Sequence, residues 1–154
     1  MHKIIFLDID GVLNSRKSTE KNLETAVSPK YIELPDKELI KNLNYIIENT
    51  GAKCILSSTW RYSYGYFALD TILYLLGAMP EILIGQTKGD RATRGREIEH
   101  WLKGKHIESF VVLDDETDIA PYMDNLVRVD SKVGLTKYDA ERAIKILNGD
   151  INDT

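Results

Sequence analysis

The sequence contains a single cysteine and no long apolar run. Cys54 has no second cysteine with which to form an internal disulfide, and a lone thiol inside an apolar segment is typical of a reducing compartment. No apolar run approaches the ~20 residues that a transmembrane helix requires. The first apolar run, residues 4–7, is also too short for a signal peptide. We therefore expect a cytoplasmic protein that does not enter the membrane.

Internal repeats, low-complexity segments, linkers and a P-loop pattern are also absent from the sequence. The 154 residues are the usual size of one domain, so we expect one domain over residues 1–154. The net charge of −4 gives no overall attraction to nucleic acid. Basic residues nevertheless gather in one segment, here called the basic stretch: Lys88, Arg91, Arg94, Arg96, Lys103 and Lys105. Such a cluster is usually a solvated face, and it gains meaning only beside a phosphate site.

Short apolar runs alternate with segments of helical periodicity along the chain. The runs predict strands at residues 4–7, 54–56, 82–84, 110–113 and 126–129. Apolar spacing predicts helices over 36–50, 64–76, 95–102 and 136–147, with Gly51 and Thr136 as caps. Residues 14–35 show no period and are predicted to form a loop or a small excursion, and the tail after residue 149 is expected to fray. This order predicts an α/β fold: a mainly parallel five-stranded sheet with helices on both faces.

Three predicted strands end in polar residues. The first runs into Asp8-Ile9-Asp10-Gly11, the second into Ser57-Ser58-Thr59, and the fourth into Asp114-Asp115, with Asp118 shortly after. Ligands of open parallel sheets bind beyond the carboxyl ends of the strands. We therefore expect these three strand ends to meet at one site.

The spacing of Asp8 and Asp10 is the most specific of these signals. It places both carboxylates on one side of an extended segment, where they repel unless a cation or a proton intervenes. Gly11 then permits a sharp turn away from the sheet. Asp114 and Asp115, at a second strand end, can converge with Asp8 on a single hard cation. Each motif alone could be a strand-end turn, but the two together favour a cation site.

The other two signals are weaker individually. The hydroxyl groups of Ser57, Ser58 and Thr59 could bind a phosphoryl oxygen, although serine and threonine also cap helices. Arg94 opens a predicted helix about 20 residues before Asp114 and offers a fixed positive charge. An ordinary surface arginine is the alternative interpretation for that position.

Taken in order, these motifs resemble those of the haloacid dehalogenase (HAD) superfamily. The resemblance runs from residue 4 to about residue 118: D-x-D-G-V-L, a strand ending in Ser/Thr, a basic residue opening a helix, and a strand ending in D-D-x-x-D. It implies a three-layer Rossmann-like core and a Mg²⁺-dependent phosphohydrolase that forms an aspartyl-phosphate. The roles that it implies are Asp8 as nucleophile, Asp10 as general acid/base, Ser57 and Arg94 as phosphoryl-binding groups, and Asp8, Asp10 (through its backbone carbonyl), Asp114, Asp115 and Asp118 as metal ligands or their supports.

Two of these assignments have alternatives. Ser58 could replace Ser57, and Lys88 could replace Arg94, although the helix-start position favours Arg94. Further phosphate or substrate contacts are expected from the residues around the strand ends, namely Gly11, Ser58, Thr59, Trp60, Arg61 and Lys88.

The sequence also suggests a substrate class. The segments 14–35 and 62–93, where this superfamily often inserts a cap domain, are too short for a substantial cap, so we expect an open site. Trp60, Arg61 and Tyr62 could stack on a base or sugar, although Trp60 could equally be a core residue. The segments S-S-T-W-R and R-G-R-E-I-x-x-W-L resemble the HAD domain of Swiss Army Knife RNA repair proteins, and their layout is similar to the phosphatase module of polynucleotide kinase–phosphatases. This resemblance implies a nucleic-acid end, with a 3′-phosphate favoured, or a nucleotide.

Three other functions are compatible with parts of this pattern. A capless protein phosphatase would act on phosphoserine peptides. A receiver-type signalling domain would carry its phosphorylated aspartate after a middle strand, where this chain has Ser57. A catalytically silent binding module would be expected to lack one of the acids. Nothing in the sequence indicates an obligatory protein partner.

Overall fold

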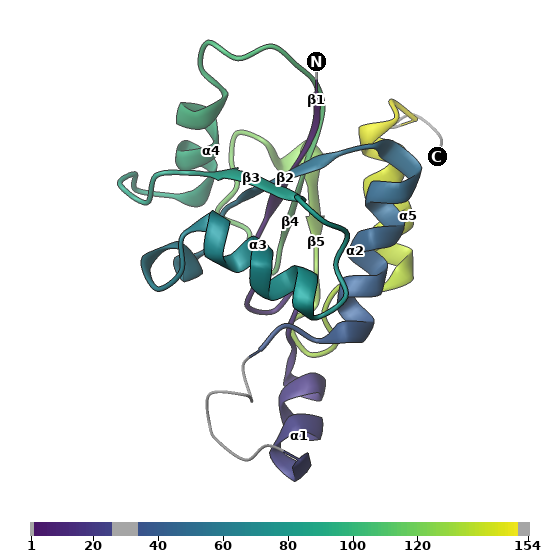
Figure 1. The fold of residues 1–154 in the computed structure, drawn as a ribbon. Helices are drawn as coiled ribbons and strands as arrows, with labels where there is room; N and C mark the ends of the chain where they lie inside the picture. The colour runs from purple at the N-terminus through teal and green to yellow at the C-terminus, as the bar shows by residue number, and fades with distance from the viewer. Residues whose placement is uncertain (1, 26–33, 151–154) are drawn as a thin grey trace.

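The computed structural model describes residues 2–25 and 34–150 of the chain. Its strands form one parallel sheet in the order β3-β2-β1-β4-β5 (Figure 1). Their bounds are β1 (His2–Leu7), β2 (Lys53–Leu56), β3 (Leu83–Gln86), β4 (Ile107–Asp114) and β5 (Leu126–Arg128). Every pairing is parallel, so all five strands have their carboxyl ends at the same edge.

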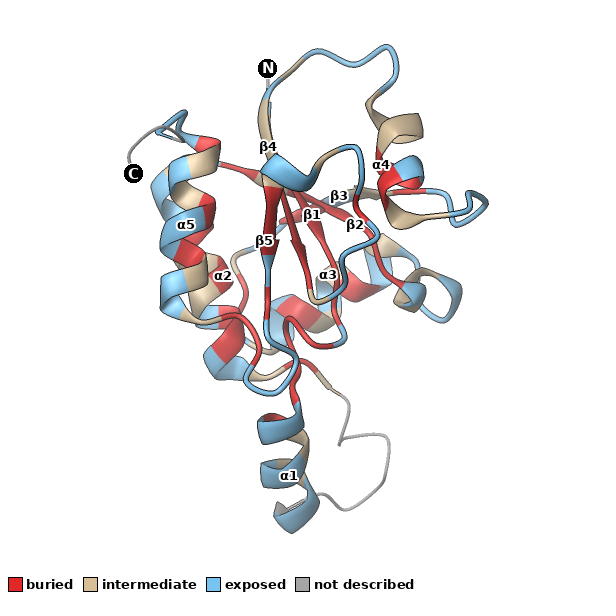
Figure 2. Cartoon of the chain, turned by 180° about the vertical axis from the view of Figure 1, so that it is seen from behind, coloured by how far each residue is buried: buried red, intermediate tan, exposed pale blue. Residues whose placement is uncertain are grey.

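Helices cover both faces of the sheet. The described helices are α1 (Arg16–Thr25), α2 (Lys37–Thr50), η2 (Thr59–Tyr62), α3 (Tyr66–Leu75), α4 (Arg94–Leu102), η3 (Met123–Asn125) and α5 (Lys137–Leu147). Helices α2, α3 and α5 pack on one face with one apolar cluster, and α4 packs on the other face with a second cluster. Figure 2 shows the strands buried between these two layers near the middle of the sheet, whereas the first residues of β1 and β4 and most of β3 are less buried. The predicted three-layer α/β fold is confirmed.

The alternation of side chains along β1 explains this layering. Ile5 and Leu7 point to the cluster under α2, α3 and α5, whereas Ile4 and Phe6 point to α4. All four side chains are almost completely buried. The Phe6 ring packs edge-on against Trp101 of α4, with ring centroids 5.4 Å apart. The residue that follows Leu7 is therefore directed towards α4.

The predicted caps of two helices are also confirmed. Gly51 ends α2 in the left-handed conformation, with φ of 71°, and its N–H donates to the Ile47 carbonyl at 2.8 Å. Thr136 and Asp139 form a capping box at the start of α5, each accepting a hydrogen bond from the backbone N–H of the other.

The prediction of a loop from residue 14 to residue 35 is wrong for residues 16–25, which form α1. This helix is polar around its circumference and therefore has no apolar face to reveal it in the sequence. Its first turn is attached to the segment after β5, because Arg16 and Lys17 donate backbone hydrogen bonds to the carbonyls of Ser131 and Lys132. Helix α1 projects from the carboxyl edge of the sheet (Figure 1). Residues 26–33 of the predicted loop lie outside the described residues.

Smaller differences concern element ends. The helix predicted over 64–76 is α3, which begins at Tyr66 and is preceded by the short helix η2. Strand β3 begins one residue later and ends two residues later than predicted, and β4 begins three residues earlier and ends one residue later. The predicted fraying of the tail concerns mainly residues 151–154, which lie outside the described residues. Among the described helices, none combines the length and the apolar character that crossing a membrane requires.

Candidate functional site

The strand register brings three predicted site residues side by side. Leu7 pairs with Leu56 of β2 and with Leu113 of β4, so Asp8, Ser57 and Asp114 occupy the next position on three neighbouring strands. The hydrogen-bond ladder continues to this position: Asp8 N–H donates to the Leu113 carbonyl at 3.1 Å, and Ser57 N–H donates to the Leu7 carbonyl at 2.8 Å. Because these positions continue the regular ladder, the sheet itself holds the three backbones in place.

Three carboxylates gather at this edge. Asp8, Asp114 and Asp115 each offer an oxygen, and these oxygens lie within 4.8 Å of one another. Asp8 and Asp114 are buried and Asp115 is half-buried. Gly11, with φ of 82°, makes room for this group, because a Cβ at residue 11 would lie 2.5 Å from Asp115 Oδ2. Carboxylate oxygens that lie close together are ligands of the kind that Mg²⁺ binds, so the chemistry of this group fits that ion.

Arg94 is the positive charge at the centre of the site. Its Nη1 lies 3.1 Å from Asp8 Oδ1 and 3.2 Å from Asp114 Oδ2, and it donates to the Ser57 carbonyl at 2.7 Å. Arg94 is the first residue of α4, whose start is fixed by Asp118: the Asp118 carboxylate accepts from Arg94 N–H at 3.3 Å, and its carbonyl accepts from Gly95 N–H at 2.9 Å. Lys88, the alternative to Arg94, is exposed on the segment that precedes this helix.

The charged groups of the site shift one another's pKa values. Burial, then the charge of Asp114, raises the pKa of Asp8, and Arg94 offsets only part of this effect. Burial is also the main cause that raises the pKa of Asp114, again against the opposing effect of Arg94. For Arg94, burial acts to lower the pKa, but Asp8 and Asp114 outweigh it and hold the pKa above its usual value. The carboxylates thus carry more negative charge than one arginine neutralises, which favours a bound cation or a retained proton.

The two serines after β2 have different surroundings. Ser57 Oγ is buried and has no hydrogen-bond partner within the described part of the chain. Ser58 Oγ instead accepts from Trp60 N–H at 3.2 Å and caps η2. A buried hydroxyl without a partner is costly in a native protein, and it is a common property of groups reserved for a ligand. This difference favours Ser57 over Ser58 as the ligand-binding hydroxyl, whereas Thr59 is exposed at the start of η2.

Asp10 lies outside the group of three carboxylates. Its side chain is held by a different set of contacts: Oδ1 accepts from Asn14 Nδ2 at 3.0 Å and from Trp60 Nε1 at 2.9 Å. Asn14 Oδ1 in turn accepts from Gly11 N–H at 2.9 Å, which closes the turn after β1. The carboxylate of Asp118 is likewise absent from the described group, since it is directed to the start of α4. The structure therefore brings the carboxylates of Asp8, Asp114 and Asp115 together, and those of Asp10 and Asp118 lie outside this group. The metal contact expected from the Asp10 backbone carbonyl stays a prediction.

Arg61 makes a buried ion pair rather than an exposed contact. Its Nη2 lies 3.1 Å from Glu97 Oε2, and the two side chains are only 5% and 8% exposed. Its Nη1 donates to the Ser58 carbonyl at 2.8 Å. This pair joins the segment after β2 to α4, the two elements that carry Ser57 and Arg94. Arg61 thus contributes to the position of the site more directly than to a surface for stacking.

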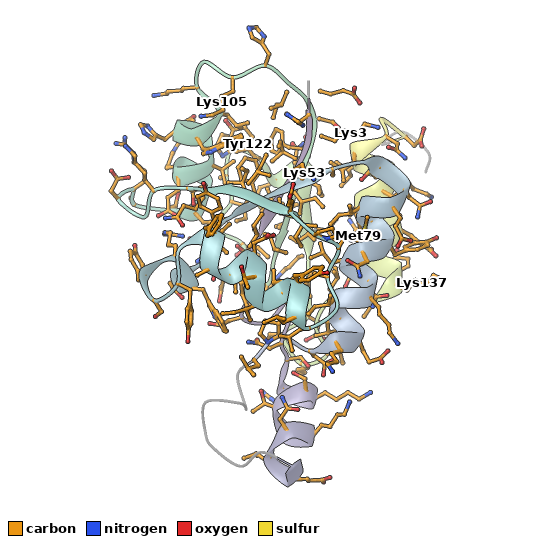
Figure 3. The ribbon with its side chains drawn as sticks, in the orientation of Figure 1. Lys3, Lys53, Met79, Lys105, Tyr122 and Lys137 are labelled. Atoms are coloured by element: carbon orange, nitrogen blue, oxygen red, sulfur yellow. The ribbon has the colours of Figure 1, made fainter. Side chains whose placement is uncertain are left out.

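The basic stretch does not form one face beside the site. Arg91 lies 3.6 Å from Asp90, and Arg96 lies 3.1 Å from Glu99, so both charges have acidic neighbours. Lys105 follows α4 and donates to the Trp101 carbonyl at 2.6 Å. Because α4 begins at the carboxyl edge, its last turn and Lys105 lie at the opposite end of the sheet, as Figures 1 and 3 show. The interpretation of this stretch as a solvated face is therefore the better one for its second half.

Two residues of the site were not identified from the sequence. Asn14 and Glu97 are both buried and polar, and they contact Asp10 and Arg61 respectively. The position of Asn14, four residues after Asp10 in a polar turn, is compatible with such a contact but is not specific for it. Glu97 offers no signal, because an acidic residue in the first turn of a helix is common.

Comparison with known protein families supports the grouping of these residues. The family described as "HAD domain in Swiss Army Knife RNA repair proteins" matches residues 4–140, which include all the strands except the first two residues of β1, and every site residue named above. Neither the curated proteins nor the solved structures contain a match to this chain.

Proposed function

The chain belongs to the family of HAD domains found in Swiss Army Knife RNA repair proteins, and we propose that it is a Mg²⁺-dependent phosphohydrolase that acts through an aspartyl-phosphate. The observation that carries this proposal is that Asp8, Asp114 and Asp115 each bring a carboxylate oxygen within 4.8 Å of the others, and that Arg94 forms ion pairs with the first two. A nucleophilic carboxylate beside a fixed cation and a cation-binding acidic pair is an arrangement suited to phosphoryl transfer.

In the proposed first step, an oxygen of Asp8 attacks the phosphorus atom of a phosphomonoester. The new bond joins Asp8 to phosphorus while the bond to the ester oxygen breaks. Arg94 and the Ser57 hydroxyl stabilise the charge on the phosphoryl oxygens, a role for which the unpartnered Oγ of Ser57 is suited. Mg²⁺, held by Asp8, Asp114 and Asp115, would supply the charge that allows a carboxylate to approach an anionic phosphate.

Asp10 is proposed as the general acid and base. It gives a proton to the departing ester oxygen and then takes one from the water that hydrolyses the aspartyl-phosphate, which restores Asp8 and releases inorganic phosphate. Acid–base help of this kind typically contributes ~10²–10⁴-fold to the rate. Its exposed position at the rim of the site suits a group that must meet both a leaving group and water.

A nucleic-acid end, with a 3′-phosphate favoured, or a nucleotide is the proposed substrate class. The family description supports it, and so does the absence of an inserted cap between β2 and β4, where α3 and β3 are parts of the core itself. The basic stretch gives this proposal less support than its sequence suggested, because several of its charges are paired. The proposed enzyme differs from a receiver domain, whose strand order of 2-1-3-4-5 is not the order found here.

A substrate panel with one variant tests both parts of the proposal. Phosphate release is measured with Mg²⁺ from oligonucleotide 3′- and 5′-phosphates, mononucleotides and phosphoserine peptides, for wild-type protein and Asp8→Asn. We expect the 3′-phosphate or the nucleotide to be preferred and the variant to be folded but inactive. Near-normal turnover by Asp8→Asn would disprove the nucleophile. A preference for phosphopeptides, or equally poor activity on every substrate, would disprove the substrate class.

A further inference from the structure

We propose that Trp60 is a positioning residue for the general acid, and that it does this by fixing which oxygen of Asp10 faces the substrate. The inference rests on the proposed function, because it gives Asp10 the role of proton donor. It also assigns Trp60 a role other than stacking on a base of the substrate.

The contacts of Asp10 are unequal on its two oxygens. Oδ1 accepts two hydrogen bonds, from Trp60 Nε1 at 2.9 Å and from Asn14 Nδ2 at 3.0 Å. Within the described residues, Oδ2 has no hydrogen-bond partner. An oxygen with two N–H donors is poorly placed to carry a proton, because the proton would meet those donors. The geometry therefore leaves Oδ2 as the oxygen that carries and transfers the proton.

Trp60 is itself held firmly enough to act in this way. Its backbone N–H is bonded to Ser58 Oγ, and its ring packs on Tyr64, with centroids 5.7 Å apart and an angle of 34° between the planes. The half-buried ring also contacts the apolar cluster under α2 and α3. Its only N–H on the ring is committed to Asp10. A ring that is packed on two sides is better suited to orient the neighbouring Asp10 side chain than to move and stack on a base of the substrate.

Asn14 provides the second hold on the same oxygen. Its side chain bridges Gly11 N–H and Asp10 Oδ1, so it ties the carboxylate to the turn that follows β1. Trp60 belongs to η2, which follows β2. The orientation of Asp10 is consequently set from two neighbouring strand ends, and either contact alone would leave the carboxylate free to rotate about its terminal bond.

The test compares two esters that differ in their need for an acid. The 4-nitrophenolate of p-nitrophenyl phosphate departs without protonation, whereas the sugar oxygen of a nucleoside 3′-phosphate needs a proton. Trp60→Phe keeps an aromatic ring at this position and removes the indole N–H. We expect kcat/KM, which reports only the steps up to formation of the aspartyl-phosphate, to fall roughly tenfold for the nucleoside 3′-phosphate, a fraction of what a general acid contributes. For p-nitrophenyl phosphate, kcat/KM should change less than about twofold, because its leaving group needs no acid. The Ki of the free nucleoside as a competitive inhibitor should stay the same. Tyr64→Phe, which keeps the packing on Trp60, serves as the matched control and should leave both reactions unchanged.

Two results would overturn the inference. An equal loss of kcat/KM on both esters would indicate a general structural role, and a rise in the Ki of the free nucleoside would indicate that Trp60 binds the base. A second measurement is independent of turnover. The Trp60 indole N–H signal in a ¹H–¹⁵N spectrum, assigned by its loss in Trp60→Phe, should move in Asp10→Ala, and an unmoved signal would disprove the contact. Hydrolysis of neither ester by the wild-type protein would disprove the proposed function instead, so the two failures are distinguishable.

Discussion

Asp8 is expected to make the metal-free protein less stable as the pH rises. Burial and the charge of Asp114 raise the pKa of Asp8 from 3.8 to about 8. At pH values between 3.8 and about 8, the folded protein retains a proton on Asp8 that the unfolded chain has released. The stability linked to this proton is fully present below the unfolded pKa and is lost as the pH rises through the folded pKa. Each pH unit within the window lowers the free energy of unfolding by about 1.4 kcal/mol.

The variant Asp8→Asn isolates this contribution. From pH 5 to pH 7 the free energy of unfolding of the wild-type protein should fall by about 3 kcal/mol more than that of the variant. Asp8 is only 6% exposed, so solvent screening requires little discount. The proton belongs to the pair that Asp8 forms with Asp114. Since Asp114 is present in both proteins, its own shift largely cancels in the comparison.

Urea denaturation in EDTA at pH 5, 6 and 7 measures this difference. Asp90→Asn, which alters an exposed aspartate, is the matched control and should keep the pH dependence of the wild-type protein. Mg²⁺ at 100 times its dissociation constant should then restore about 2.7 kcal/mol to the wild-type protein and much less to Asp8→Asn. The same pH dependence in Asp8→Asn and wild type would refute the reasoning, because the retained proton would then lie elsewhere.

Three further predictions concern residues in the site or beside it. Gly95→Ala would drive a Cβ into the backbone carbonyls of residues 119–120 at the start of α4, and thermal unfolding should show a loss of about 1–3 kcal/mol. Glu97→Leu leaves the buried Arg61 without its counter-charge, so the free energy of unfolding measured in urea should fall by about 3–5 kcal/mol. Adding Arg61→Met to the same chain should recover most of this loss, and a loss below about 1 kcal/mol in Glu97→Leu would contradict the prediction. Ser57→Ala removes a buried hydroxyl that has no partner among the described residues, so the free energy of unfolding should rise by about 1 kcal/mol. The kcat of the variant should fall about 10²-fold, and an unchanged kcat would exclude Ser57 from phosphate binding.

The sheet and most of its helices could be predicted from the sequence because their signals are local. Buried parallel strands appear as short apolar runs, and the helices that cover them carry a periodic apolar face. Helix α1 lacks such a face, so its polar sequence was predicted to be a loop. Its start depends on backbone bonds to residues 131 and 132, more than 100 positions away in the sequence, which no local pattern records.

The site was predictable to the extent that it follows from strand register. Asp8, Ser57 and Asp114 directly follow predicted strands, and parallel pairing places them at one edge. The contacts of Arg61 depend on how η2 packs on α4, and those of Trp60 depend on how η2 packs on the turn after β1. The sequence therefore left stacking and core packing equally open for Trp60. Asn14 and Glu97 were missed for the same reason, since their roles appear only when their partners are in place.

The most direct test of the account is to trap the covalent intermediate. Wild-type protein is mixed with Mg²⁺ and a phosphomonoester, quenched rapidly in acid, and digested for mass spectrometry. The account predicts one added phosphoryl group on the peptide that contains Asp8, lost when the digest is treated with hydroxylamine and absent from Asp8→Asn. A phosphoryl group on another residue, or steady hydrolysis by a protein that never carries one, would contradict it.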